Sequence, residues 1–87
     1  MNVLQTIKGI LISDLLVDIP AERMEPGDSL RDAYGLDSLG YVEMRVCMEQ
    51  TFGITIGDDD FSPVNFSTLG GVQALVERLL QDQETVG

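Results

Sequence analysis

The fold is decided by residues 37–53, which read DSLGYVEMRVCMEQTFG. Asp37 and Ser38 are both suited to capping a helix by accepting a backbone N–H bond, and Gly53 is a typical helix stop. Placing the residues between these ends at about 100° per step puts apolar side chains on two opposite sides of one helix. One side carries Tyr41, Met44, Met48 and Phe52, and the other carries Leu39, Val42 and Val46.

The second apolar side of this helix needs either a cover or a partner. One small bundle cannot easily bury both sides, and Glu43 and Glu49 flank the side that carries Leu39. We therefore expect an exposed apolar strip, made of Leu39, Val42 and Val46, with carboxylates at its rim. Such a strip suits a partner with an apolar groove edged by Arg or Lys. The alternative is that this side packs against a long loop of the same chain.

The region before this helix is expected to hold one helix and one long loop. Apolar residues recur at helical spacing from Val3 to Val17, which predicts a first helix that ends before Pro20. Residues 18–36 contain two Pro and two Gly, so they predict a loop. Structureless loops of this length are uncommon in small domains, so an ordered, packed loop is expected. Four apolar residues are candidates to hold it against the core: Ile19, Met24, Leu30 and Leu36.

The region after this helix predicts two further helices. Pro63 suits the first position of a short third helix. A last helix should begin at Thr68, capped by Ser67 or Thr68 itself, and give way to a flexible polar tail from about residue 82. The sequence thus predicts one all-α domain spanning residues 1–87, a four-helix bundle with a long first loop and a short third helix. With no Trp and five aromatic residues, its core must come mainly from Leu, Ile, Val and Met.

Composition restricts the partners and the compartment. Fifteen acidic residues against five basic ones give a formal net charge of −10, which repels nucleic acid and anionic membranes and attracts proteins with basic surfaces. Cys47 is the single cysteine, which excludes an intramolecular disulfide and favours a reducing compartment. The first apolar run is interrupted by Asp14, too early for a signal or membrane-spanning segment. We expect a free-standing, monomeric, cytoplasmic protein.

The chain offers little for catalysis or metal binding. It contains no His, so neither a Ser/His nor a Cys/His nucleophile arrangement is possible. Cys47 is predicted to be a small residue at the core edge rather than a reactive thiol. The run Asp58-Asp59-Asp60 lacks the alternating ligands, glycine and closing Glu of an EF-hand loop. An acidic loop is therefore expected there, with no metal site, and the chain is expected not to be an enzyme.

The stretch Tyr34-Gly35-Leu36-Asp37-Ser38-Leu39, continued by Val42-Glu43-Met44 and by the segment from Glu49 to Ile54, resembles the acyl carrier protein family. The resemblance extends over roughly residues 29–80. It implies that Ser38 receives 4′-phosphopantetheine from coenzyme A, and that Asp37 serves the modifying transferase when it binds magnesium and coenzyme A. The implied partners are that transferase and the acyl- or aminoacyl-loading and processing enzymes, which would dock on Leu39, Val42, Glu43, Val46 and Glu49.

The attachment at Ser38 also has a physical rationale. A phosphodiester at a helix N-terminus meets free N–H groups and the positive end of the helix dipole. On position alone, however, a Ser at a helix start is far more often just a cap.

Two features bear on the cargo. The segment 61–66 lengthens the approach to the last helix and resembles discrete carriers of polyketide or nonribosomal peptide pathways. A Gly-Gly-x-Ser motif, common in peptidyl carriers, is absent around Ser38. This favours an acyl cargo held as a thioester and leaves an aminoacyl cargo open. The rival hypothesis is an unmodified acidic helical adaptor that uses the same strip only to bind a protein.

Overall fold

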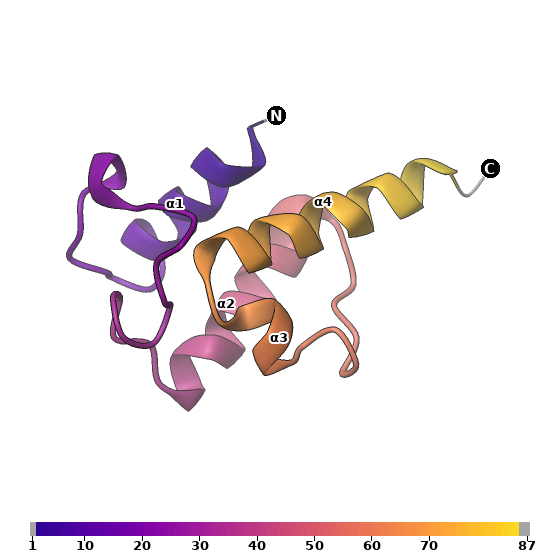
Figure 1. Ribbon diagram of the computed structural model, residues 1–87. Coiled ribbons are helices and arrows are strands. Elements are labelled where there is room, and N and C mark those ends of the chain that lie inside the picture. Colours follow the sequence, from indigo (N-terminus) through magenta and orange to yellow (C-terminus); the bar gives the residue numbers. More distant parts are fainter. Residues whose placement is uncertain (1, 86–87) are drawn as a thin grey trace.

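A computed structural model describes residues 2–85 and is built of helices (Figure 1). The helices are α1 (Val3–Ser13), α2 (Ser38–Phe52), α3 (Pro63–Phe66) and α4 (Leu69–Thr85), with a 3-10 turn, η1, at Ala21–Arg23. This confirms the predicted all-α fold with its long first loop and short third helix. Ser62 caps α3 ahead of Pro63, as the position of that proline suggests.

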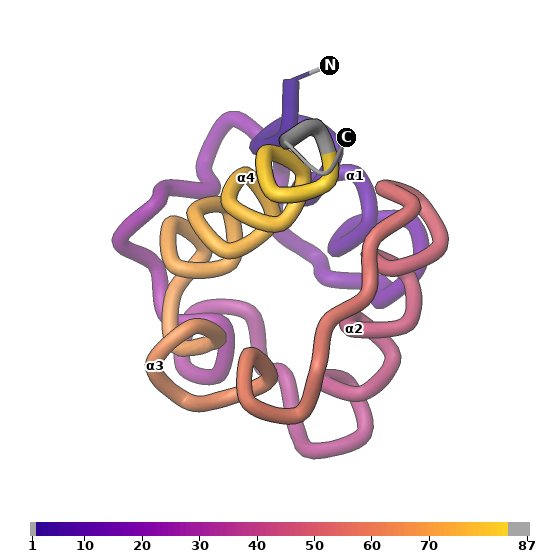
Figure 2. The backbone as a smooth tube through the Cα atoms, turned by 90° about the vertical axis from the view of Figure 1, so that its right-hand side faces the viewer, coloured from indigo at the N-terminus to yellow at the C-terminus, as the bar shows by residue number. Residues whose placement is uncertain are grey.

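The helices enclose one apolar core. The α1 helix packs against both α2 and α4, and α3 packs against α4; Figure 2 looks nearly along α4 and shows the other segments arranged around the same interior. The largest fully buried side chains are Ile, Leu, Met and Val, as the composition predicts. They are Ile7, Leu11, Leu30, Met44, Met48, Ile56, Leu69, Val72 and Val76.

The first helix is shorter than predicted, and the boundary at Val17 was wrong. The α1 helix ends at Ser13, and Leu16 takes a left-handed backbone conformation with φ of 58°. The Val17 N–H donates to the Leu11 carbonyl at 2.9 Å, and Val17 is buried. The chain reversal therefore places Val17 in the core. An apolar residue at this position would also suit a continued helix, so the apolar pattern does not reveal where the helix ends. The left-handed conformation costs an ordinary L-residue about 1–2 kcal/mol.

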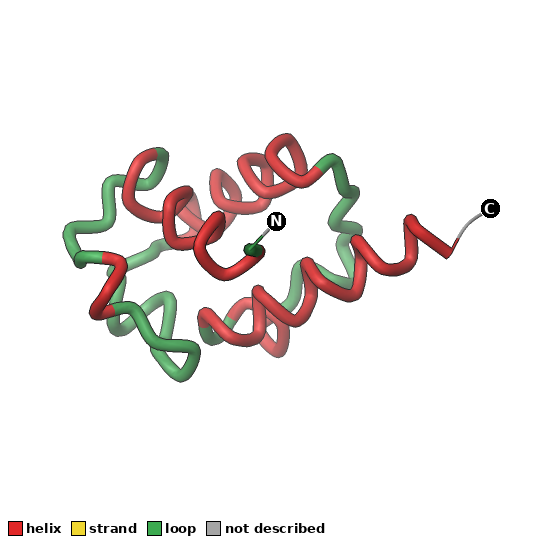
Figure 3. Tube along the Cα trace, turned by 90° about the horizontal axis from the view of Figure 1, so that it is seen from above, coloured by secondary structure: helices red, strands yellow, loops and turns green. Residues whose placement is uncertain are grey.

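The long loop is packed and ordered along much of its length, as predicted. Met24, Leu30 and Leu36 are buried. Backbone bonds tie the loop to the start of α4: the Leu30 N–H donates to the Ser67 carbonyl at 3.0 Å, and the Gly70 N–H donates to the Pro26 carbonyl at 2.8 Å. In Figure 3 the loop segments lie at the end of the bundle where α4 begins. The loop is thus part of the fold rather than a free connection.

The two glycines at the start of α4 are explained by close approach of other backbone segments. A Cβ on Gly70 would lie 3.0 Å from the Pro26 carbonyl oxygen, and one on Gly71 would lie 2.9 Å from the Asn65 carbonyl oxygen. The Gly71 N–H donates to the Thr68 hydroxyl at 3.1 Å, so Thr68 caps the helix. The glycines weaken this helix turn locally but allow the loop and α3 to pack against it.

The end of α4 lies further along the chain than predicted. The helix continues through Thr85, so it includes residues 82–85 of the expected tail, and residues 86–87 lie outside the described part. The Gln83 side chain donates to the Gly53 carbonyl at 2.7 Å, linking this last turn to the end of α2. Gly53 itself has φ of 66°, the left-handed conformation in which glycine commonly ends a helix.

The close approach at Gly71 predicts a specific loss of stability. Gly71→Ala should lower the free energy of unfolding by about 1–3 kcal/mol, because the added methyl group overlaps a backbone oxygen. Gly9→Ala is the matched control: Gly9 lies exposed within α1 with nothing near its Cβ position, so alanine should raise stability by about 0.5–1 kcal/mol. Urea unfolding followed by circular dichroism measures both. Equal changes in the two variants would contradict the packing account.

Candidate functional site

The candidate site is centred on Ser38, the first residue of α2. Asp37 is the N-cap: its backbone is extended, and its Oδ1 accepts the Gly40 N–H at 2.8 Å. The Asp37 carboxylate therefore does the capping that Ser38 could have done. Both residues are exposed, and the Ser38 hydroxyl has no hydrogen-bond partner among the described residues. The hydroxyl is thus accessible and uncommitted.

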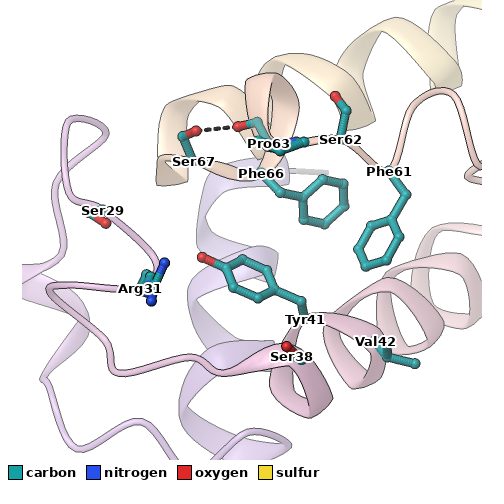
Figure 4. Close-up of a pocket in the computed structure, with 10 residues that line it drawn as sticks. All are labelled: Ser29, Arg31, Ser38, Tyr41, Val42, Phe61, Ser62, Pro63, Phe66 and Ser67. Atoms are coloured by element: carbon teal, nitrogen blue, oxygen red, sulfur yellow. Dashed lines mark hydrogen bonds between the residues drawn. The ribbon is translucent and has the colours of Figure 1, made fainter.

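A hollow of about 530 Å³ opens beside Ser38. Its walls include Tyr41 from α2 and Phe61 and Phe66 from the segment around α3, so we call it the aromatic hollow. Figure 4 shows these three rings gathered between α2 and that segment, with Arg31 at one side. Phe61 and Phe66 meet edge to face, with ring centroids 4.9 Å apart. The hollow therefore presents an apolar surface directly next to the serine.

Polar side chains of α2 hold one wall of this hollow. The Arg45 Nε donates to the Ile56 carbonyl at 3.0 Å, while Glu49 Oε2 accepts the Ile56 N–H at 2.8 Å. The two side chains thus bind both backbone polar groups of Ile56, and we call this pair of contacts the clasp. The Arg45 guanidinium also lies 4.9 Å from the Phe61 ring centroid, a cation–π contact. The clasp fixes the chain that leads to Phe61.

The apolar strip is open to solvent. Leu39, Val42 and Val46 are 67%, 48% and 44% exposed, so the loop does not cover this side of α2. Glu43 beside the strip is exposed, as expected for a rim residue. Glu49 is half-buried and bound to the Ile56 N–H, so its carboxylate is already used inside the domain.

A second hollow, of about 470 Å³, is lined by the chain neighbours of Ser38, Asp37 and Leu39. Its lining includes the apolar side chains of Leu16 and Leu39 and the carboxylates of Asp18, Asp37 and Glu43, so we call it the acidic hollow. The place of Leu16 in this hollow could not be predicted from the apolar pattern, because Leu16 lies within the span predicted for the first helix. Its positive φ is visible only in the structure.

The surroundings of Ser38 fit the phosphodiester implied by the family resemblance. The N–H groups of Ser38 and Leu39 have no acceptor within the helix, because the first turn of a helix leaves such donors unpaired. These donors and the positive end of the 15-residue α2 dipole favour a negative group at this point. The exposed hydroxyl and the aromatic hollow provide access and space.

The acidic run is used in ion pairs. Asp58 lies 3.2 Å from Arg45, and Asp60 lies 2.8 Å from Arg78. In the second pair Arg78 donates a hydrogen bond to Asp60, and this contact raises the pKa of the guanidinium. Among residues 2–83, no three His, Cys, Asp or Glu side chains are grouped so that they could hold a metal ion. In the same part of the chain, every helix is too short or too polar to span a membrane.

Comparison with known proteins agrees with this geometry. Residues 5–81 match the family model described as "Phosphopantetheine attachment site". The chain is 34% identical over 77 residues to an acyl carrier protein of Sinorhizobium fredii, covering 88% of this chain and 94% of that protein. It is 37% identical over 60 residues to an acyl carrier protein of Nitratidesulfovibrio vulgaris, covering 69% of this chain and 76% of that protein.

The matched region runs from α1 through most of α4 and includes the exposed serine, its cap and both hollows. An accessible hydroxyl at a helix start, an all-helical fold and relatives of similar length agree with one another. The chain therefore belongs to the acyl carrier protein family, and its cofactor is 4′-phosphopantetheine.

Proposed function

We propose that Ser38 is the residue to which 4′-phosphopantetheine is attached. One observation carries the proposal: the Ser38 hydroxyl is exposed and unpaired at the first residue of α2, because Asp37 has taken over the capping bond. The transferase breaks the diphosphate bond of coenzyme A, joins the phosphopantetheine phosphate to Ser38 Oγ as a phosphodiester and releases adenosine 3′,5′-bisphosphate together with the serine proton. The helix N-terminus stabilises the added negative charge. When bound, the arm supplies a thiol that carries cargo as a thioester.

Asp37 has two functions in this proposal. Its Oδ1 accepts the Gly40 N–H and so fixes the start of α2. The side chain is nevertheless exposed, which leaves the other carboxylate oxygen accessible beside Ser38. That oxygen is available to the magnesium ion with which the transferase binds coenzyme A.

The cargo is proposed to be an acyl intermediate of a polyketide, nonribosomal peptide or related pathway, with an aminoacyl cargo left open. The lengthened approach to α4 supports this choice. That approach contributes Phe61 and Phe66 to the aromatic hollow, where they face Tyr41 (Figure 4). An apolar or ring-containing part of the cargo can lie against these three side chains when the arm folds back.

Partner enzymes are proposed to dock on the apolar strip of Leu39, Val42 and Val46. Its exposure supports this function, since an apolar surface on a helix costs solubility unless a partner covers it. Glu43 at the rim and the net charge of −10 favour partners with basic surfaces. Glu49 contributes less than its position suggests, because it holds the Ile56 N–H. Such contacts are weak and salt-sensitive, which allows quick release.

The protein is proposed to be a monomeric, cytoplasmic carrier and not a catalyst. The surroundings of Cys47 support the last of these points. Burial first, and then the Asp14 carboxylate with its hydrogen bond and Glu43, raise the pKa of the thiol above its ordinary value of 9.0. A thiol is nucleophilic as the thiolate, so Cys47 is a poor nucleophile at neutral pH.

Intact mass measurement tests the attachment. With a phosphopantetheinyl transferase, magnesium and coenzyme A, the wild-type chain should gain the mass of one arm, and Ser38→Ala should gain none. Ser13→Ala is the matched control, because Ser13 is an exposed serine at the end of α1 and its removal should leave the gain intact. An unchanged mass of the wild-type chain would favour the unmodified adaptor.

A charge placed in the apolar strip tests docking. Val46→Glu should leave the unfolding midpoint nearly unchanged, since Val46 is 44% exposed, and should lower the rate of loading by a partner enzyme roughly tenfold or more. Thr51→Glu, at an exposed position away from the strip on the same helix, should change neither quantity. If Val46→Glu unfolds the domain, the strip belongs to the core and the docking proposal fails.

Thiol labelling tests the state of Cys47. Because burial and the nearby Asp14 carboxylate raise the pKa of the Cys47 thiol, labelling should be slower at pH 7 in the folded protein than in the unfolded chain and should rise in alkaline solution. Asp14→Asn should lower the pKa and speed labelling, since it removes the nearby negative charge. Labelling of the folded wild-type protein at pH 7 as fast as that of the urea-unfolded chain would contradict this account.

A further inference from the structure

We propose that Leu16 is a contact residue for the phosphopantetheinyl transferase, on the acidic hollow that adjoins the α2 strip at Leu39. The proposal rests on the proposed attachment at Ser38 and extends it by naming where the modifying enzyme sits. It is carried by two independent properties of Leu16, its backbone conformation and its exposure, together with its place in the acidic hollow.

The backbone at Leu16 is unfavourable for the residue that occupies it. Among residues 2–85, Leu16 is the only residue other than glycine with a positive φ. Left-handed residues are common after a helix end, but they are usually Gly or Asn, because a Cβ is strained there. The reversal that buries Val17 needs the conformation and does not need the Leu side chain.

The Leu16 side chain also contributes little to the core. It is 80% exposed, while its neighbour Val17 is 8% exposed. Glycine at this position would relieve the strain and remove an apolar group from water. A leucine here is therefore unfavourable for the isolated domain in two ways. A strained residue that does not stabilise the fold is a reason to look for a function in binding or catalysis.

The place of Leu16 indicates the kind of partner. Leu16 and Leu39 both line the acidic hollow, together with the carboxylates of Asp18, Asp37 and Glu43. None of the described residues that line it is Lys or Arg. Leu16 and Leu39 are the large apolar residues of this lining that are exposed, and acidic residues lie in the same lining. The hollow thus complements a protein surface with an apolar side chain between basic ones.

The enzyme that must cover this surface is the one that reacts at Ser38 Oγ. Asp37 precedes Ser38 directly and lines the acidic hollow, so an enzyme with Ser38 in its active site lies against the hollow's edge. Enzymes that process the cargo reach it through the arm and can stand further from the serine. Leu16 is therefore assigned to the transferase.

The test compares the kinetics of modification with the stability of the same variants. Leu16→Gly should raise the unfolding midpoint or leave it unchanged and should lower the kcat/KM of arm transfer about tenfold, the loss expected for one buried leucine contact. Leu16→Asn, whose side chain is polar and whose backbone tolerates a positive φ, should show the same unchanged or raised midpoint and the same loss of kcat/KM as Leu16→Gly. Leu16→Met keeps the apolar reach and should retain the wild-type rate.

Each outcome separates the two proposals. If the wild-type chain gains no arm, the attachment at Ser38 fails. If it gains the arm and Leu16→Gly is modified at the wild-type kcat/KM, the contact at Leu16 is overturned while the attachment stands. A Leu16→Gly variant that loses both stability and rate would assign Leu16 to the fold and would also overturn the contact.

Discussion

The hydrogen bond from the Gly40 N–H to Asp37 Oδ1 is the constraint on which the rest of the site depends. It sets the first residue of α2 and holds the chain extended just before it. Since Asp37 caps the helix, the Ser38 hydroxyl is left without a partner and faces solvent. If the serine itself capped the helix, its oxygen would be occupied at the very position where a negative group is best tolerated.

The α2 helix contributes to the core with one side and to the exposed surface with the other. Its inner side buries Met44 and Met48 completely, and its outer side leaves the apolar strip in water. Between these sides, Arg45 and Glu49 bind the C=O and N–H groups of Ile56 and so hold one wall of the aromatic hollow. The inner side of α2 thus stabilises the domain, and the outer side stays available for the proposed docking.

Local patterns made α2 and the core predictable. The Asp-Ser start, the Gly53 stop and the apolar periodicity act within a few residues, so the helix bounds and the exposed strip could be predicted from the sequence. The end of α1 could not, because apolar residues continue at helical spacing to Val17 although the chain leaves the helix after Ser13. The use of Glu49 inside the domain also escaped prediction, since its acceptor bond joins segments seven residues apart and depends on how the loop folds back.

The two hollows could not be predicted from the sequence for the same reason. Each is formed by side chains from segments that lie far apart along the chain, such as Tyr41 and Phe66 in the aromatic hollow and Leu16 and Glu43 in the acidic hollow. Ser38 lines the aromatic hollow, and its chain neighbours Asp37 and Leu39 line the acidic hollow. Both proposals for these surfaces depend on attachment at Ser38, so the identity of the modified oxygen is the central claim.

Tandem mass spectrometry of the chain after treatment with a transferase and coenzyme A tests that claim most directly. Fragments that bracket residue 38 should show the arm bonded to Ser38 alone. An arm found on Ser29 or Ser67, which line the same aromatic hollow, or fragments that all keep their original mass, would contradict the account.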